Sequence, residues 1–156
     1  MANVDNPNGF QYEYSYDSSG IALQTLKAAA STEINPGDAV FIDSDGYIDI
    51  CTNTTGKVYG VAQSYINSGS GENPDIQVIP AKKTSVFSGQ CSGTPNQTAL
   101  GTDVDIEGGT GVQELDEDGT DNTVAKLIGV AYGSEVDSAN ARMLFVWSTS
   151  QYTGDA

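Results

Sequence analysis

The 156-residue chain contains no histidine and only two cysteines, Cys51 and Cys91. Without histidine it lacks the usual general base of Ser-His and Cys-His catalytic pairs, and the commonest nitrogen ligand for zinc and iron. Two cysteines are too few for a disulfide scaffold. We expect both thiols to be free and largely buried, with a disulfide formed late as the alternative. These absences favour a protein that is not an enzyme.

Positive charge is also scarce. Six Lys and Arg residues stand against 21 Asp and Glu residues, for a formal net charge of -15. Nucleic-acid affinity comes largely from Lys and Arg that displace counterions, so we expect no direct nucleic-acid partner. An acidic exterior also repels its own copies, which keeps a protein in solution at high local concentration.

Long apolar runs are missing as well. No segment approaches the roughly 20 apolar residues that a membrane-spanning helix requires. The N-terminus has neither the basic start nor the apolar core of a secretory signal. We therefore expect a protein made in the cytoplasm, with no membrane partner.

The carboxylates that are present cluster in turns, as in Asp43 with Asp45 and Asp103 with Asp105. Because turns are solvated, such pairs do not acquire the split pKa values that acid-base catalysis needs. The densest group, residues 116–121 (DEDGTD), offers hard oxygen ligands of the kind calcium prefers, but its spacing differs from the helix-loop-helix calcium motif. We expect a solvated acidic loop there, with a calcium site as the alternative, and no cofactor.

Alternation of apolar and polar residues predicts strands almost throughout. Phe10, Tyr12, Tyr14 and Tyr16 recur with a period of two, which predicts a strand with one aromatic face. Residues 1–9 are rich in Asn, Asp, Pro and Gly, so we expect an extended arm before a single domain of residues 10–156. Further strands are predicted over residues 21–30 (where a short helix is the alternative), 39–42, 47–51, 57–62, 75–79 and 84–87.

Turn residues punctuate these strands. Asp43-Ser44-Asp45-Gly46 suits a tight hairpin, and the Gly108–Gly111 segment (GGTG) reads as a hairpin connection because no Lys follows it as in a phosphate-binding loop. Gly60 lies inside an apolar strand, which indicates a bulge or a close approach of two backbones.

The second half of the chain repeats the first. Residues 37–42 correspond to residues 101–106, residues 57–62 to residues 126–131, and residues 73–78 to residues 140–145. Three correspondences in the same order predict two quasi-repeated β units. We expect them to form a small β-barrel or β-sandwich with little helix.

Several residues admit two interpretations. The aromatic stripe of Phe10 to Tyr16 is either core, which we favour, or a subunit or partner interface, where Tyr is enriched. Trp147 is ambiguous in the same way, with core favoured, and Tyr65 is expected to be exposed. Lys82 and Lys83 form the only basic pair, either a solvated turn or a contact with an acidic partner.

A family resemblance adds to these expectations. The opening MANVDNPNGF, followed by Gly37-Asp38-Ala39-Val40, Gly60-Val61-Ala62, an acidic middle, Gly129-Val130-Ala131 and a closing apolar strand, resembles the capsid decoration (cement) proteins of tailed bacteriophages. The acidic segment of residues 116–121 departs from that pattern. The resemblance implies a small β-barrel-like homotrimer on the outer capsid surface of the virion, bound to the major capsid protein. It also implies capsid or subunit contacts, for which our candidates are Asn3, Val4, Asp5, Phe10, Tyr12, Tyr14, Lys82 and Lys83.

A carbohydrate-binding β-sandwich that attaches a particle to host glycans is the alternative. Such a module needs exposed aromatic rings with polar side chains around them, and Tyr65 and Trp147 are the candidates for that role.

Overall fold

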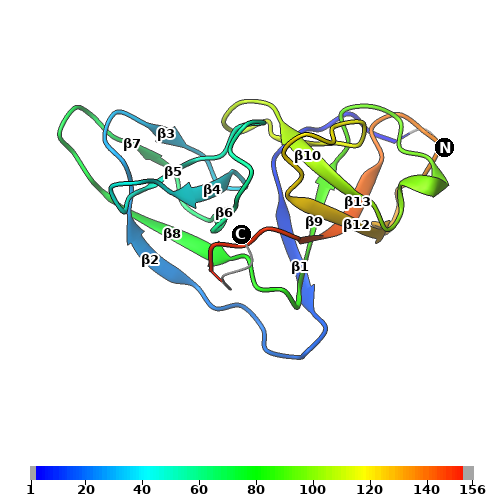
Figure 1. Cartoon of the computed structure of the whole chain (residues 1–156), viewed down its shortest axis with the longest axis horizontal. Helices are drawn as coiled ribbons and strands as arrows, with labels where there is room; N and C mark the ends of the chain where they lie inside the picture. Colours follow the sequence, from blue (N-terminus) through cyan, green and yellow to red (C-terminus); the bar gives the residue numbers. More distant parts are fainter. Residues whose placement is uncertain (1–2, 153–156) are drawn as a thin grey trace.

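The computed structural model describes residues 3–152, and these residues form an all-β protein (Figure 1). The only helix among them is a short 3-10 turn, η1 (Gln97–Ala99), and no helix there has the length and apolar character to cross a membrane. The strands are β1 (Gln11–Ser15), β2 (Gln24–Lys27), β3 (Glu33–Ile34), β4 (Ala39–Ile42), β5 (Ile48–Ile50), β6 (Gly60–Ala62), β7 (Ile66–Asn67), β8 (Asp75–Pro80), β9 (Ser85–Gln90), β10 (Asp103–Glu107), β11 (Glu114–Asp116), β12 (Ala125–Val130) and β13 (Arg142–Trp147).

The strands form two large antiparallel sheets and one small ribbon. A five-stranded sheet has the order β2-β8-β6-β4-β5, and a six-stranded sheet has the order β1-β9-β13-β12-β10-β11. The ribbon pairs β3 with β7. In Figure 1 the five-stranded sheet and the ribbon occupy one half of the molecule, and the six-stranded sheet occupies the other.

The predicted repeat is visible in this topology. Once β1 is set aside, the order β9-β13-β12-β10-β11 matches β2-β8-β6-β4-β5 strand for strand, in chain order as well as in space. Isolated parallel bridges also recur at corresponding places, between Ala28 and Ile48 in the first unit and between Cys91 and Leu115 in the second. In each unit the residue directly after β2 or β9 therefore meets the strand at the far edge of the sheet, β5 or β11, at one bridge.

Neither sheet closes into a continuous barrel within residues 3–152, so the sandwich expectation is confirmed and the barrel expectation is not. Alternate residues of the five-stranded sheet face opposite sides, and both sides are buried. Val40, Ala62 and Val78 face a core inside the first unit, whereas Ala39, Val61 and Ile79 face a larger core shared with the six-stranded sheet.

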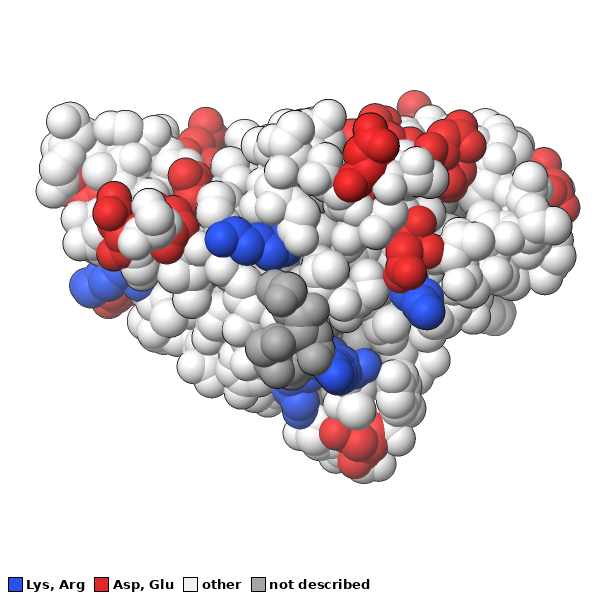
Figure 2. All heavy atoms as spheres, in the orientation of Figure 1, with Lys and Arg blue, Asp and Glu red and all other residues white. Residues whose placement is uncertain are grey.

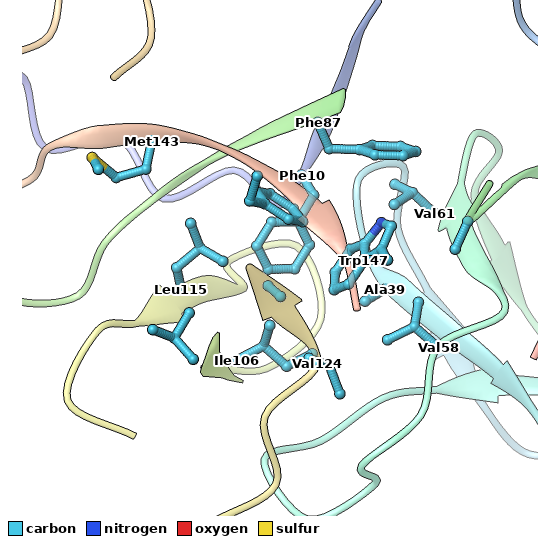
Figure 3. Close-up of a cluster of buried hydrophobic side chains, with 14 of the residues drawn as sticks. Phe10, Ala39, Val58, Val61, Phe87, Ile106, Leu115, Val124, Met143 and Trp147 are labelled. Carbon is cyan, nitrogen blue, oxygen red and sulfur yellow. The ribbon is translucent and has the colours of Figure 1, made fainter. Parts of the chain in front are cut away.

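The larger core is built around aromatic rings (Figure 3). Phe10 meets Phe145 and Trp147 edge-on, with ring centroids 5.5 and 5.3 Å apart. Phe145 and Trp147 themselves meet edge-on at 4.7 Å. Trp147 is only 2% exposed. The core interpretation of Phe10 and Trp147 is thus confirmed, and neither presents its ring at the surface.

Two buried polar side chains join the units. Asp38, which precedes β4, accepts hydrogen bonds from the Gly111 backbone N (2.8 Å) and the Thr110 hydroxyl (2.5 Å) in the β10–β11 hairpin, and from the Asn35 backbone N (2.8 Å). Its carboxylate therefore links the first unit to the second.

Gln113 makes the reciprocal link, from the second unit to the first. Its side chain accepts a hydrogen bond from the Ala39 backbone N (2.7 Å) and donates one to the Cys51 carbonyl (2.8 Å). The Ala39 N–H and the Cys51 carbonyl lie where the strand pairing of the first sheet stops. Gln113 gives both groups a hydrogen-bond partner, without which they would be buried and unpaired.

A bulge in β1 corrects the prediction of a single aromatic face. Tyr12 pairs with Phe87 and Tyr14 with Val86, so Glu13 is an extra residue without a partner on β9. One inserted residue reverses which face the following side chains occupy. Tyr12 packs against Phe87 at 5.7 Å between centroids, whereas Tyr14 and Tyr16 are exposed.

The predicted turns and the Gly60 contact are confirmed. Residues 43–47 connect β4 to β5 as an antiparallel hairpin, and the Gly108–Gly111 segment connects β10 to β11. A Cβ at Gly60 would lie 2.2 Å from the Ile79 carbonyl oxygen, so only glycine allows β6 to approach β8 this closely.

The N-terminal residues 3–9 contain no strand, but they are not a free arm. Asn3 donates from its amide nitrogen to the carbonyls of Glu135 and Ala139, both at 3.0 Å. Its amide oxygen accepts from the Glu135 backbone N at 2.9 Å. The arm therefore lies against its own domain, beside the loop of residues 131–141, where Asn3 finds its hydrogen-bond partners.

Candidate functional site

The outer face of the six-stranded sheet carries the predicted contact residue Tyr14 and lies between the turn of Lys82 and Lys83 and the N-terminal arm. Phe87, Leu127 and Phe145 point into the core, so alternation turns their neighbours outward. We define the outer face by its accessible residues, which are Tyr14, Lys126, Ile128, Leu144 and Val146.

Apolar groups on this face remain in contact with solvent. Tyr14 is 47% exposed and Ile128, which lies at the irregularity between Leu127 and Gly129, is 42% exposed. Leu144 and Val146 are half-buried. A sheet face with this composition is typical of an interaction surface, because exposed apolar groups gain free energy when a partner covers them.

The basic turn lies at one end of the outer face. A hollow there is lined by Tyr16, Lys83, Lys126, Val146, Trp147 and Ser148. The Tyr16 hydroxyl donates to the Lys83 carbonyl at 3.0 Å, and the Lys82 ammonium donates to the Ser19 hydroxyl. Ser19 and Thr84 also donate to Asp17, and these hydrogen bonds lower the pKa of Asp17 to about 2. Lys82 and Lys83 thus belong to an ordered turn.

The N-terminal arm lies at the other end of the same sheet. The Asn6 backbone N donates to the Gln90 side-chain oxygen at 2.7 Å, and the Gln90 amide nitrogen donates to Asp5 at 3.0 Å. Val4 is 81% exposed. Next to it is a pocket of about 290 Å³ lined by Asn3, Val4, Asn6, Gln90, Tyr132, Gly133, Ser134, Asn140 and Arg142.

Charge is unevenly distributed over the molecule. Figure 2 shows many of the Asp and Glu side chains of that view along the upper side over both halves of the molecule, with a further acidic group at the lower tip, and the Lys and Arg side chains mostly below the upper acidic groups. On the six-stranded sheet, Asp103 of β10 pairs with Lys126 of β12, and Asp105 of β10 pairs with Asp116 of β11. The acidic side chains of this sheet edge are therefore on β10 and β11.

Carboxylates in and beside the acidic segment of residues 116–121 are hydrogen-bonded to nearby backbone groups. No group of three His, Cys, Asp or Glu side chains within residues 3–152 is placed to hold an ion. Asp105 accepts a hydrogen bond from the Asn122 backbone N at 3.0 Å, and Glu117 accepts one from the Gly93 backbone N at 3.1 Å. Burial raises the pKa of both carboxyls, and Asp116 adds to the rise.

Both cysteines are free and buried, as predicted. Burial raises the pKa of the Cys51 and Cys91 thiols far above the ordinary value, and nearby carboxylates add to the shift. The thiolate is the reactive form, so burial and the raised pKa both lower the reactivity of these thiols at neutral pH.

We expect the native protein to leave Ellman's reagent unreacted over an hour at pH 8, because no thiolate is accessible. In 6 M guanidinium chloride the same assay should titrate two thiols per chain. Rapid reaction of either thiol in the native state would show that the core around it opens.

The predicted contact residues have different positions. Asn3, Val4 and Asp5 lie beside the arm pocket, Tyr14 is on the outer face, and Lys82 and Lys83 border its far end. Tyr12 is half-buried and Phe10 is buried, so Phe10 has no surface to offer a partner. The proposed glycan platform is also wrong in part, because Tyr65 is exposed but Trp147 belongs to the core.

Sequence reasoning missed the residues that form the arm pocket, namely Arg142, Gln90, Asn140, Asn6 and Tyr132. One signal could have pointed to them, since Arg142 is the only arginine in the chain. Comparisons with known proteins assign no family: no family model matches the chain, and no curated protein shows significant similarity to it.

Proposed function

We propose that this chain is a capsid decoration protein that binds the exterior of an expanded phage head and stabilises it. The observation that carries the proposal is the outer face, where exposed Tyr14 and Ile128 lie beside half-buried Leu144 and Val146 on a sheet whose opposite side is a complete core. Covering such a face with the major capsid protein would remove apolar surface from water.

The charge distribution supports the same proposal. Lys126 lies on the outer face and Lys83 at its edge, and none of the residues that define this face is acidic, on a chain of net charge -15. The proposed docking side is thus the less acidic one. The negative charge of the remaining surface would repel neighbouring copies and favour contact with water.

Stabilisation by such a protein needs no reactive group. A ligand that binds the expanded shell but not the disrupted one stabilises it by about 2.7 kcal/mol per site when its free concentration is 100 times its dissociation constant. We further propose a homotrimer, because a trimer that spans several capsid subunits gains affinity through effective concentration. The site of action is then the outer surface of the virion, after synthesis in the host cytoplasm.

The test uses purified protein and expanded heads that lack it. We expect the protein to sediment with the heads and to raise the temperature at which they release their DNA. The double variant Tyr14→Ser/Ile128→Ser should bind at least about thirtyfold more weakly, because two apolar contacts worth about 1 kcal/mol each are lost.

Leu23→Ser/Tyr65→Ser is the matched control, since it also replaces one aliphatic and one tyrosine residue, both exposed, but on the first unit. It should bind like the unchanged protein. Failure of the unchanged protein to bind heads contradicts the proposed function, and equal weakening by the two double variants contradicts the assignment of the outer face.

A further inference from the structure

Arg142 lies at the start of β13 under the N-terminal arm, and its guanidinium is only partly satisfied. Its Nε donates to the Ser88 hydroxyl at 3.1 Å, and one terminal nitrogen, Nη1, donates to the Asn8 side-chain oxygen at 3.2 Å. The other terminal nitrogen, Nη2, is buried and has no hydrogen-bond partner. A buried donor without a partner costs free energy, so this nitrogen marks a place for an acceptor.

No carboxylate compensates Arg142 directly. Among residues 3–152 it forms no ion pair within 4.0 Å, and the nearest linked acid, Glu13, reaches only Ser88, at 2.6 Å. The residues that line the pocket beside this single arginine include no acid, and the carboxylate of Glu13 acts on it only through space. Arginine keeps its charge in proteins, so this position attracts an anion.

The pocket beside Arg142 is lined by amides and hydroxyls rather than by apolar side chains. Asn6 and Asn140 contribute side-chain amides that make no hydrogen bond within the described part of the chain, and the ring of Tyr132 is fully exposed at the rim. Free amides offer both donors and acceptors, which match sugar hydroxyls, and an exposed aromatic ring can pack against the flat face of a sugar.

We propose that this pocket binds an acidic sugar of the hexuronate class, with the carboxylate on Arg142 and the hydroxyls on Asn6 and Asn140. Its volume of about 290 Å³ is at the lower limit of small-molecule sites, about 300 Å³, which favours a single sugar unit over a longer segment.

The geometry of the guanidinium explains how a carboxylate would bind. The neutral side-chain oxygen of Asn8 accepts a hydrogen bond from Nη1, and no acceptor lies within hydrogen-bond distance of Nη2. A carboxylate has two oxygens at the spacing of these two nitrogens and binds them both, as a charge-assisted pair. It would replace Asn8, which is feasible because residues 3–8 bury no side chain and are held by polar contacts.

This inference does not depend on the proposed decoration function. It concerns the arm pocket and not the outer face, and it can be tested on the isolated protein in the absence of capsids. It also uses other residues than Tyr65 and Trp147.

The sole arginine makes the test direct, because the side-chain Nε–H of Arg142 gives one signal in an ¹⁵N NMR spectrum. Titration with glucuronate should move that signal saturably, with a dissociation constant of about 1 mM for a ligand of this size. The full-length protein is used, and its backbone spectrum reports whether the fold is intact. An Arg142 signal that stays fixed up to 50 mM glucuronate would overturn the proposal.

Three ligands separate the parts of the proposal. Glucose lacks the carboxylate and acetate lacks the ring, so both should bind at least tenfold more weakly than glucuronate. If glucose binds as tightly as glucuronate, Arg142 does not bind a carboxylate. If acetate binds as tightly, the sugar ring and its hydroxyls contribute nothing to binding. Tighter binding of a short peptide rich in glutamate would overturn the sugar assignment in favour of a protein carboxylate.

Variants locate the site. Arg142→Gln should abolish glucuronate binding as followed by backbone signals of residues 132–134. Because that variant could disturb the sheet, Tyr132→Ala and Asn6→Ala provide a second test at the exposed rim, and each should weaken binding severalfold. Lys82→Gln lies at the far end of the sheet and should leave binding unchanged; unaltered binding in all three pocket variants would contradict the site.

Discussion

Phe10→Ala is expected to lower the free energy of unfolding by about 4 kcal/mol, the range measured for truncation of buried aromatic residues. The ring is 1% exposed and contacts Phe145 and Trp147 edge-on. It also covers Gly89, where a Cβ would lie 2.6 Å from the ring, so no neighbour is placed to fill the space that it leaves. Urea denaturation followed by Trp147 fluorescence measures the loss.

The contrast with the arm makes this prediction specific. Deletion of residues 3–8 removes polar contacts of a segment that buries no side chain, and should cost about 1–2 kcal/mol. If the deletion destabilises the protein as strongly as Phe10→Ala, the domain does not begin at Phe10 and the arm belongs to the folded core.

Asp38→Ala is expected to destabilise the protein by about 3–4 kcal/mol, because hydrogen bonds to a charged acceptor contribute about 1.5–3 kcal/mol each and cannot be replaced by water in a buried site. The carboxylate serves donors of Asn35, Thr110 and Gly111 and is fully buried. The melting temperature should fall by about 10 °C in a chain of this length. Asp38→Asn, which keeps one acceptor oxygen, should lose about half as much.

Asp43→Ala is the control for Asp38. Asp43 also accepts two backbone hydrogen bonds, from Asp45 and Tyr47, each at 2.9 Å, but these stay within one hairpin turn near solvent. We expect a loss of about 1 kcal/mol or less. A melting temperature for Asp38→Ala close to that of Asp43→Ala would show that the link between the two units contributes little to stability.

The repeat was predictable from sequence because the same short residue patterns occur in both halves of the chain. Glycines mark the approach of strands, as at Gly60, and each unit repeats the same succession of apolar strands. The predicted hairpins and strands followed from turn residues and alternation, both of which act over a few neighbours. The ribbon of β3 with β7 was not predicted, since its two-residue strands are too short to show a period.

The sites that depend on distant residues were predicted less well. The bulge at Glu13 separates Tyr14 and Tyr16 from Phe10, and no local signal marks it, because register is chosen by the pairing of β1 with β9. No local pattern distinguishes Asp38 or Arg142 from other charged residues near the start of a strand. Their roles arise from partners far away in the chain, at Thr110 and at Asn8.

By itself, the sequence determined the all-β class, the two quasi-repeated units, the reduced buried thiols and the strongly anionic character of this protein. These properties follow from composition and from patterns with a period of a few residues. Only the tertiary structure decided which tyrosines reach the surface, that the arm lies on its own domain and that a lone arginine is left short of an acceptor. Each of those depends on which side chains meet across the sheets, and burial and hydrogen bonding between distant residues are not encoded in any short stretch of the chain.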